Sequence, residues 1–293
     1  MVVPVVRVYL LNILRFLVAV FLLSLPWMRA SRCFGQEPPR LTEEQSQARE
    51  KLNEGVQNFK NGQYEEAARD FLRAKQLDPK LLNARLYLAT TYASRYIPGA
   101  PSEENTRVGR AAIEEFRGVV NMDPQNISAI DGLGSLLFQM AGSPFDPDLF
   151  RESKSYNEKH IYLRPDDPEP YYWIGVIDWT LAFRANGQLR AKYNLSVRGK
   201  QLSDEAPLPP ELREEYVRMY GEAIDEGIES LNHAISIKPD YDDAMAYLNL
   251  LYRRRADTVA SENEREQLMK IADDLIDRVK DIKQKRSETS SQP

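Results

Sequence analysis

The stretch AREKLNEGVQNFKNGQYEEAARDFLRAKQLDPKL, residues 48–81, contains two short amphipathic helices separated by a turn. Asn61-Gly62 predicts the turn, because this pair readily adopts the backbone conformation that ends a helix. Asp78-Pro79 ends the second helix. That helix carries one apolar stripe, with side chains at spacings of three and four: Tyr64, Ala67, Phe71, Ala74 and Leu77. Two such helices cannot bury their apolar faces alone, so the stretch predicts one unit of a stacked repeat array.

Later prolines mark further copies of the unit. An apolar residue precedes each of four prolines by two positions, as in Leu77/Pro79, Met122/Pro124, Leu163/Pro165 and Ile237/Pro239. Small or apolar residues recur nine and ten positions after these prolines, except for Asn249 at the last: Leu88 and Ala89, Leu133 and Gly134, Ile174 and Gly175, Leu248 and Asn249. The recurring register predicts an array of about five repeats.

The first repeat resembles the tetratricopeptide repeat (TPR), a helix-turn-helix unit of about 34 residues. The matching positions are Gly55, Tyr64, Ala67, Phe71, Ala74 and Pro79. Lys51 and Asn58 depart from it, because the family prefers large side chains there. The resemblance implies an all-α, right-handed superhelical solenoid of about five TPR-like helical hairpins over residues 48–285. Residues 171–179 and 242–252 also look like segments of exported bacterial TPR proteins, which implies export and the fold but no activity.

The intervals between the marking prolines exceed the repeat length, which predicts insertions in repeats two, three and four. The first two cover residues 96–106 and 141–148 and are rich in glycine and proline. The third, residues 184–220, is expected to begin as a basic polar loop. It should then start a helix at Glu211 that runs without a break to Ile237. Residues 286–293 are polar and are expected to form a disordered tail.

The N-terminus is typical of an export signal. Residues 1–35 hold four arginines and no acid, and residues 16–25 form an apolar core of signal-peptide length. Cys33-Phe34-Gly35 is a plausible cleavage site, which predicts an exported protein, periplasmic or secreted. In the alternative, residues 8–28 stay uncleaved and anchor the chain in the inner membrane; lipidation of Cys33 is disfavoured by the preceding Arg32. Residues 36–47 form a linker and the start of the first helix.

Composition excludes several classes of function. The net charge of −5 and the pI near 5.4 argue against nucleic-acid binding, which needs clustered cations. One cysteine and two histidines cannot build a disulfide framework or a Cys/His metal cluster. His160 is expected to be a hydrogen-bonded packing residue. Because no nucleophile, base and orienting group can be assembled, we expect no cofactor and no enzymatic activity.

The TPR resemblance implies a concave groove lined by the first helix of each repeat, where an extended peptide or a partner helix binds. Carrying the groove positions over gives these candidate partner-binding residues: Phe59, Phe138, Tyr172, Val176, Trp179, Arg253 and Arg254. Leu52 and Val56 replace the lysine and asparagine with which some TPR proteins grip a peptide carboxylate, so that mode is disfavoured. Two alternatives stay open: the insertions fill the groove, and residues 253–255 are simply a solvated helix end favoured by the helix dipole.

These observations predict a non-catalytic protein-protein interaction scaffold in the bacterial envelope. Its partner would be a protein or peptide, and the membrane would be involved only through an uncleaved N-terminal segment. The alternative is a small-molecule or glycan-binding protein that uses the groove aromatics as a stacking platform.

Overall fold

The computed structural model describes residues 41–197, 201–204 and 206–290. Within these ranges the regular secondary structure is entirely helical. The helices, in chain order, are α2 (Glu43–Lys60), α3 (Tyr64–Leu77), α4 (Leu82–Arg95), α5 (Glu103–Met122), α6 (Ile127–Ala141), α7 (Pro147–Leu163), α8 (Pro168–Ser196), α9 (Pro210–Ile237), α10 (Asp242–Ala256) and α11 (Glu262–Ser290).

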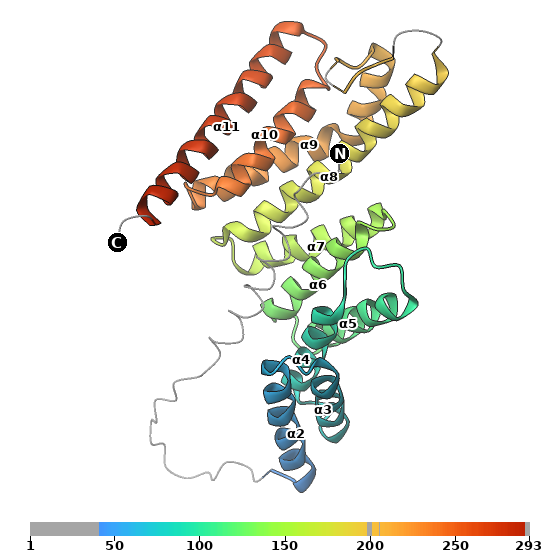
Figure 1. Cartoon of the computed structure of the whole chain (residues 1–293), viewed down its shortest axis with the longest axis vertical. Helices are drawn as coiled ribbons and strands as arrows, with labels where there is room; N and C mark the ends of the chain where they lie inside the picture. Colours follow the sequence, from blue (N-terminus) through green and yellow to red (C-terminus); the bar gives the residue numbers. More distant parts are fainter. Residues whose placement is uncertain (1–40, 198–200, 205, 291–293) are drawn as a thin grey trace.

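Consecutive helices pair into five hairpins, which stack in chain order along the long axis of the molecule (Figure 1). This confirms the predicted all-α solenoid of about five hairpins. The first helices of successive hairpins also touch: α2 contacts α4, α4 contacts α6, and α8 contacts α10. Phe138 of α6 and Trp173 of α8 complete the series, with ring centroids 5.2 Å apart. We call α2, α4, α6, α8 and α10 together the first-helix layer.

Local features of the sequence explain why the first hairpin forms. Thr42 and Gln45 cap α2 reciprocally, each side chain accepting a hydrogen bond from the other residue's backbone N–H at 3.1 Å. Gly62 has a φ of 76°, which allows the chain to turn back into α3. At Gly55 an added Cβ would lie 2.6 Å from the Phe71 ring, so glycine permits the close approach of the two helices.

Among the described residues the apolar core divides into four clusters of buried side chains, and the largest of them lies around the last two hairpins. There, α8, α9 and α10 enclose several side chains with essentially no exposed surface: Tyr216, Ile224, Leu231, Met245 and Leu251. A much smaller cluster lies between the first two hairpins and contains Ala67, Ala68 and Phe71 of α3 with Leu88 of α4. The largest cluster therefore provides the rigid base for the surface described below.

The insertion in the fourth hairpin differs from the expected one. The loop predicted from residue 184 onward is wrong, because α8 continues as helix to Ser196. The continuation keeps a buried face at Ala185, Asn186, Leu189 and Arg190, the spacing of one helix side. The unbroken α9 is confirmed, beginning at Pro210. Both helices of the hairpin are thus long, and they project together beyond the rest of the array (Figure 1).

The other insertions and the C-terminus also differ in part. Residues 96–102 form a loop, but the remainder of the first insertion lengthens α5, and residues 142–146 separate α6 from α7. The disordered tail expected from residue 286 is wrong for residues 286–290, which are helical. Arg286 holds that end in place, donating to Asp242 at 2.8 Å. Residues 291–293, the export signal over residues 1–35 and the alternative anchor over residues 8–28 lie outside the described residues.

None of the helices in the described ranges combines the length and the apolar character needed to span a bilayer.

Candidate protein-interaction surface

A stacked and partly exposed aromatic pair lies on α8, with its two residues one helical turn apart. The rings of Trp179 and Phe183 are stacked, with centroids 5.2 Å apart and an interplanar angle of 22°. Tyr247 of α10 packs edge-on against Trp179, with ring centroids 5.2 Å apart. Trp179 is half-buried, whereas 51% of Phe183 is exposed. We call Trp179 and Phe183 the aromatic shelf.

A guanidinium lies beside the shelf. Cζ of Arg254, in the last turn of α10, is 6.0 Å from the centre of the Phe183 ring. Its Nη1 is 3.1 Å from the carboxylate of Asp257, and 17% of its side chain is exposed. The shelf therefore offers an apolar surface with a guanidinium over the Phe183 ring.

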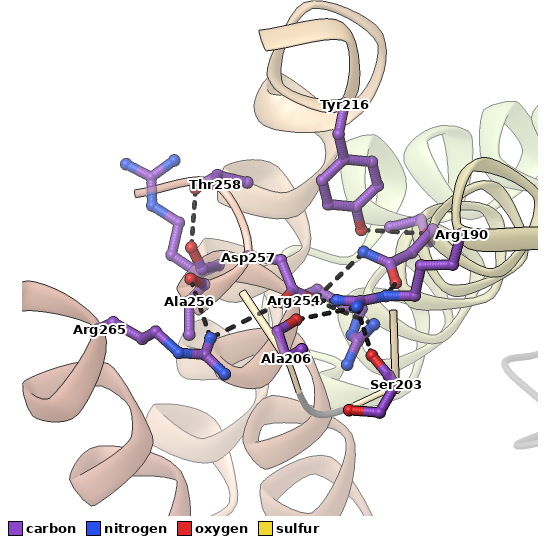
Figure 2. A network of polar contacts seen from close by, with 12 residues as sticks. Arg190, Ser203, Ala206, Tyr216, Arg254, Ala256, Asp257, Thr258 and Arg265 are labelled. Carbon is purple, nitrogen blue, oxygen red and sulfur yellow. Dashed lines mark hydrogen bonds and ion pairs between the residues drawn. The ribbon is translucent and has the colours of Figure 1, made fainter. Parts of the chain in front are cut away.

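A buried polar network fixes the position of Arg254 and of the long end of α8 (Figure 2). Arg190 and Asp257 are each only 3% exposed, and they form an ion pair at 3.1 Å. Asn186 bridges them, donating to Asp257 at 3.2 Å and accepting from Arg190 at 2.7 Å. Arg190 also donates to the backbone carbonyls of Ser203 and Ala206. The network ties the α8 extension and the segment after it to the turn between α10 and α11.

Two of the predicted groove residues are core residues. Tyr172 is 7% exposed and Val176 is 1% exposed, so their assignment as ligand contacts is wrong. The start of α10 covers them, because Tyr172 packs against Tyr241 and Tyr247 with ring centroids 5.1 and 5.8 Å away. Trp173 contacts Tyr172 from its own helix.

The other predicted residues are spread over the molecule. Phe138 is half-buried and packs edge-on against Phe150 and Trp173, while Phe59 lies edge-on to Tyr64 in the first hairpin. Among these candidates, only Trp179 and Arg254 are brought to one place. Arg253 is instead paired with Asp273 at 2.6 Å, and its neighbour Arg255 with Asp225 at 3.0 Å.

Phe183 was missed by the sequence analysis because it stands directly before the expected insertion. The signal was present: Phe183 follows Trp179 by four residues, and Tyr172, Val176, Trp179 and Phe183 share one helix face. Burial divides that stripe in two. The N-terminal half is covered by α10, and the C-terminal half reaches the surface.

Two other clusters of titratable side chains, around His160 and around Asp178, stabilise contacts between neighbouring helices. His160 is buried, with Nδ1 2.6 Å from Asp131 and Nε2 3.3 Å from Asp167, which agrees with its prediction as a packing histidine. Burial opposes protonation, but the two carboxylates outweigh it and raise the pKa of His160 to about 9. Burial raises the pKa of Asp178 to about 7, although Lys154 lies 2.8 Å away. In each cluster one side chain is buried, His160 or Asp178, and it is paired with groups on neighbouring segments.

The described part of the chain offers little for a small-molecule site. Two surface concavities of about 520 and 590 Å³ are each lined by one helix and the residues just before it, α5 and α2 respectively. A strip of exposed helix does not surround a ligand as cofactor sites do. Among the residues described, no three His, Cys, Asp or Glu side chains are grouped closely enough to hold a metal ion.

No protein-family model and no curated protein matches this chain. Solved structures do resemble it. A crystal structure of MamA has a TM-score of 0.54 at 17% identity and covers 83% of this chain and 95% of that one. MamA from Desulfovibrio magneticus RS-1 gives 0.53 at 14% identity, covering 82% and 96%. YrrB, described as a TPR protein with an unusual peptide-binding site, gives 0.50 at 13% identity, covering 80% and 88%.

The chain has a TPR-like fold. At these levels of identity the likeness concerns the fold. The TPR-like solenoid departs from a uniform array in its fourth hairpin, where α8 and α9 have 29 and 28 residues. The aromatic shelf lies on this enlarged hairpin.

Proposed function

We propose that the TPR-like solenoid is a non-catalytic protein-interaction scaffold that binds an extended segment of another protein along its first-helix layer. The observation that carries the proposal is the aromatic shelf. An aromatic side chain that is 51% exposed and already stacked on a second ring loses little conformational freedom when a partner covers it. Such rigid aromatic residues are enriched where proteins bind one another.

Two further observations support a peptide as the partner. The first-helix layer is continuous, and its surface residues around the shelf are mixed apolar and polar, including Thr180, Leu250 and Arg254. The similar fold of YrrB carries a peptide-binding site. We place the scaffold in the bacterial envelope because of the apolar, arginine-flanked segment at its N-terminus.

The test is retention of partner proteins from an extract of the cells in which the protein occurs. Phe183→Ala removes the exposed ring and should abolish retention of the partners that use the shelf. Tyr162→Ala is a matched control, because Tyr162 is 87% exposed but lies on α7, outside the first-helix layer. If Phe183→Ala and Tyr162→Ala retain the same proteins as the unmodified chain, the shelf is not the interaction site.

The flat Trp179–Phe183 stack also favours a second candidate, glycan binding, since sugar rings stack on exposed aromatic faces. Soluble oligosaccharides would then quench tryptophan fluorescence in a saturable manner, and Phe183→Ala would remove the effect. Quenching by peptides but not by sugars would decide for the scaffold.

A further inference from the structure

Arg254 shares its counter-ion with a more deeply buried arginine. Asp257 is 3.1 Å from both Arg190 and Arg254 and 3.7 Å from Arg265, so one carboxylate faces three guanidinium groups. Arg190 is enclosed and depends on Asp257, because an unpaired buried charge is very costly. Arg254 is the most exposed of the three, at 17% of its side chain against 3% for Arg190 and 14% for Arg265, and it is the one beside the shelf. Its charge is therefore the one available to a partner.

The neighbouring arginines differ in this respect. Arg253 and Arg255 each have an acid of their own, Asp273 and Asp225, at 2.6 and 3.0 Å. Their charges are compensated within the chain, and neither has a ring contact with the shelf like that of Arg254. The incompletely neutralised charge of the triplet is thus the one next to Phe183.

The distance between the two groups sets a spacing. Cζ of Arg254 is 6.0 Å from the centre of the Phe183 ring. In an extended chain, side chains two residues apart point to the same side and are separated by roughly 6–7 Å. A partner segment that places one side chain on Phe183 therefore brings the side chain two positions further along to Arg254.

We infer that the shelf and Arg254 together recognise an extended, acidic partner segment that carries a large apolar residue and, two positions away, an aspartate or glutamate. This inference rests on the proposed function and names the partner's chemistry. Phe183 and Trp179 bind the apolar side chain, and Arg254 donates to the carboxylate. Asp257 holds the guanidinium of Arg254 in place, and the remaining N–H groups of Arg254 bind the ligand.

The experiment is a selection from random peptides displayed at the N-terminus of a phage coat protein, with the full-length protein in mild detergent as target. This display leaves no free C-terminal carboxylate, so an acid that is selected must be a side chain. Enriched peptides should share an apolar residue and an acid at a spacing of two. Synthetic versions are then measured by titration against the unmodified protein and its variants.

Changing the selected acid to its amide should weaken binding to the unmodified protein by about tenfold, as expected for loss of a charge-assisted hydrogen bond. The same change should have no effect on binding to Arg254→Gln. Arg253→Gln is the matched control and should bind the acidic peptide normally. Because the acid-to-amide comparison is made on the unmodified protein, the result does not depend on how well a variant folds.

The outcomes separate the two proposals. Peptides that lack acids, or that lose nothing with the amide, overturn the inference about Arg254. If those peptides still need Phe183, the scaffold function stands. If no peptide is enriched over an unrelated protein of similar charge, both proposals fail.

Discussion

At the scale of single residues, the buried charge on His160 makes stability depend on pH. The carboxylates of Asp131 and Asp167 raise the pKa of His160 to about 9 in the folded protein, from 6.5 in the unfolded chain. Their stabilisation is therefore complete below pH 6.5 and is lost as the pH rises through 9. Over that window we expect the free energy of unfolding to fall by about 2 kcal/mol more than in a His160→Gln variant.

The measurement is urea unfolding of both proteins across this pH window. Lysine and tyrosine groups that titrate in the same range are common to the two proteins, so they cancel in the difference. Parallel pH profiles for the unmodified protein and His160→Gln would show that the imidazole is neutral in the fold.

At the scale of one helix, two glycines of α8 should respond to alanine in opposite directions. A Cβ at Gly175 would overlap the side chain of Leu231 on α9, while a Cβ at Gly187 would have no atom within 4 Å. Gly175→Ala should therefore destabilise the protein by about 1–3 kcal/mol through overpacking. Gly187→Ala should stabilise it by up to about 1 kcal/mol, since alanine favours the helix.

Thermal and urea unfolding of the two variants test this pair. Leu231→Ala makes room for the methyl group that Gly175→Ala adds. The double variant should therefore lose less stability than the sum of the losses in the two single variants. Equal stability of the single variants would mean that α8 and α9 do not approach each other as described.

Between elements, breaking the buried ion pair that joins α8 to the α10–α11 turn should lower the stability of the protein substantially. Asp257→Asn keeps the shape but removes the charge that compensates the enclosed Arg190, so we expect a loss of about 3 kcal/mol or more. Asp225→Asn is the matched control, because its pair with Arg255 is exposed and should contribute less than about 1 kcal/mol. Urea unfolding at one pH measures both.

A double variant shows whether charge burial is the cause. Arg190→Met together with Asp257→Asn removes both buried charges and should recover part of the stability lost in Asp257→Asn alone. A double variant that is less stable than either single variant would attribute the cost to packing instead.

At the scale of the whole molecule, unequal cores predict unequal local stability. The first hairpin buries a small cluster around Phe71, whereas the last two share a large one around Tyr216 and Met245. Contacts in such an array are mainly between neighbours, so distant hairpins open independently. Backbone hydrogen exchange should be about tenfold or more faster in α2 and α3 than in α8 and α9. Uniform exchange would show that the array unfolds as one cooperative unit.

The repeated fold was predictable because its signals are local. The Asn61-Gly62 turn and the prolines act within one repeat unit, and each does what the pattern indicated. The α2 cap and the close helix approach at Gly55 are local in the same way. The number of hairpins follows from their spacing.

The departures arise from contacts between residues far apart in the sequence. Arg190 looks like a loop residue until Asp257, 67 positions later, provides its counter-ion. Tyr172 looks like a ligand contact until Tyr241 covers it. The site was therefore predictable as a helix face containing Trp179, but which turns of that face are open depends on the neighbouring hairpin.

The ion pair in Figure 2 also limits how the molecule can be altered by exchange of its parts. Arg190 belongs to the fourth hairpin and Asp257 to the turn between the two helices of the fifth. Each hairpin therefore supplies the counter-ion for a buried charge of the other. Replacing either hairpin with a generic repeat leaves a buried charge without its counter-ion. The boundary between the third and fourth hairpins carries a buried pair as well, because Lys154 of α7 lies 2.8 Å from Asp178 of α8. The fourth and fifth hairpins therefore have to be kept or replaced together, and a replacement of both must still provide a partner for Lys154.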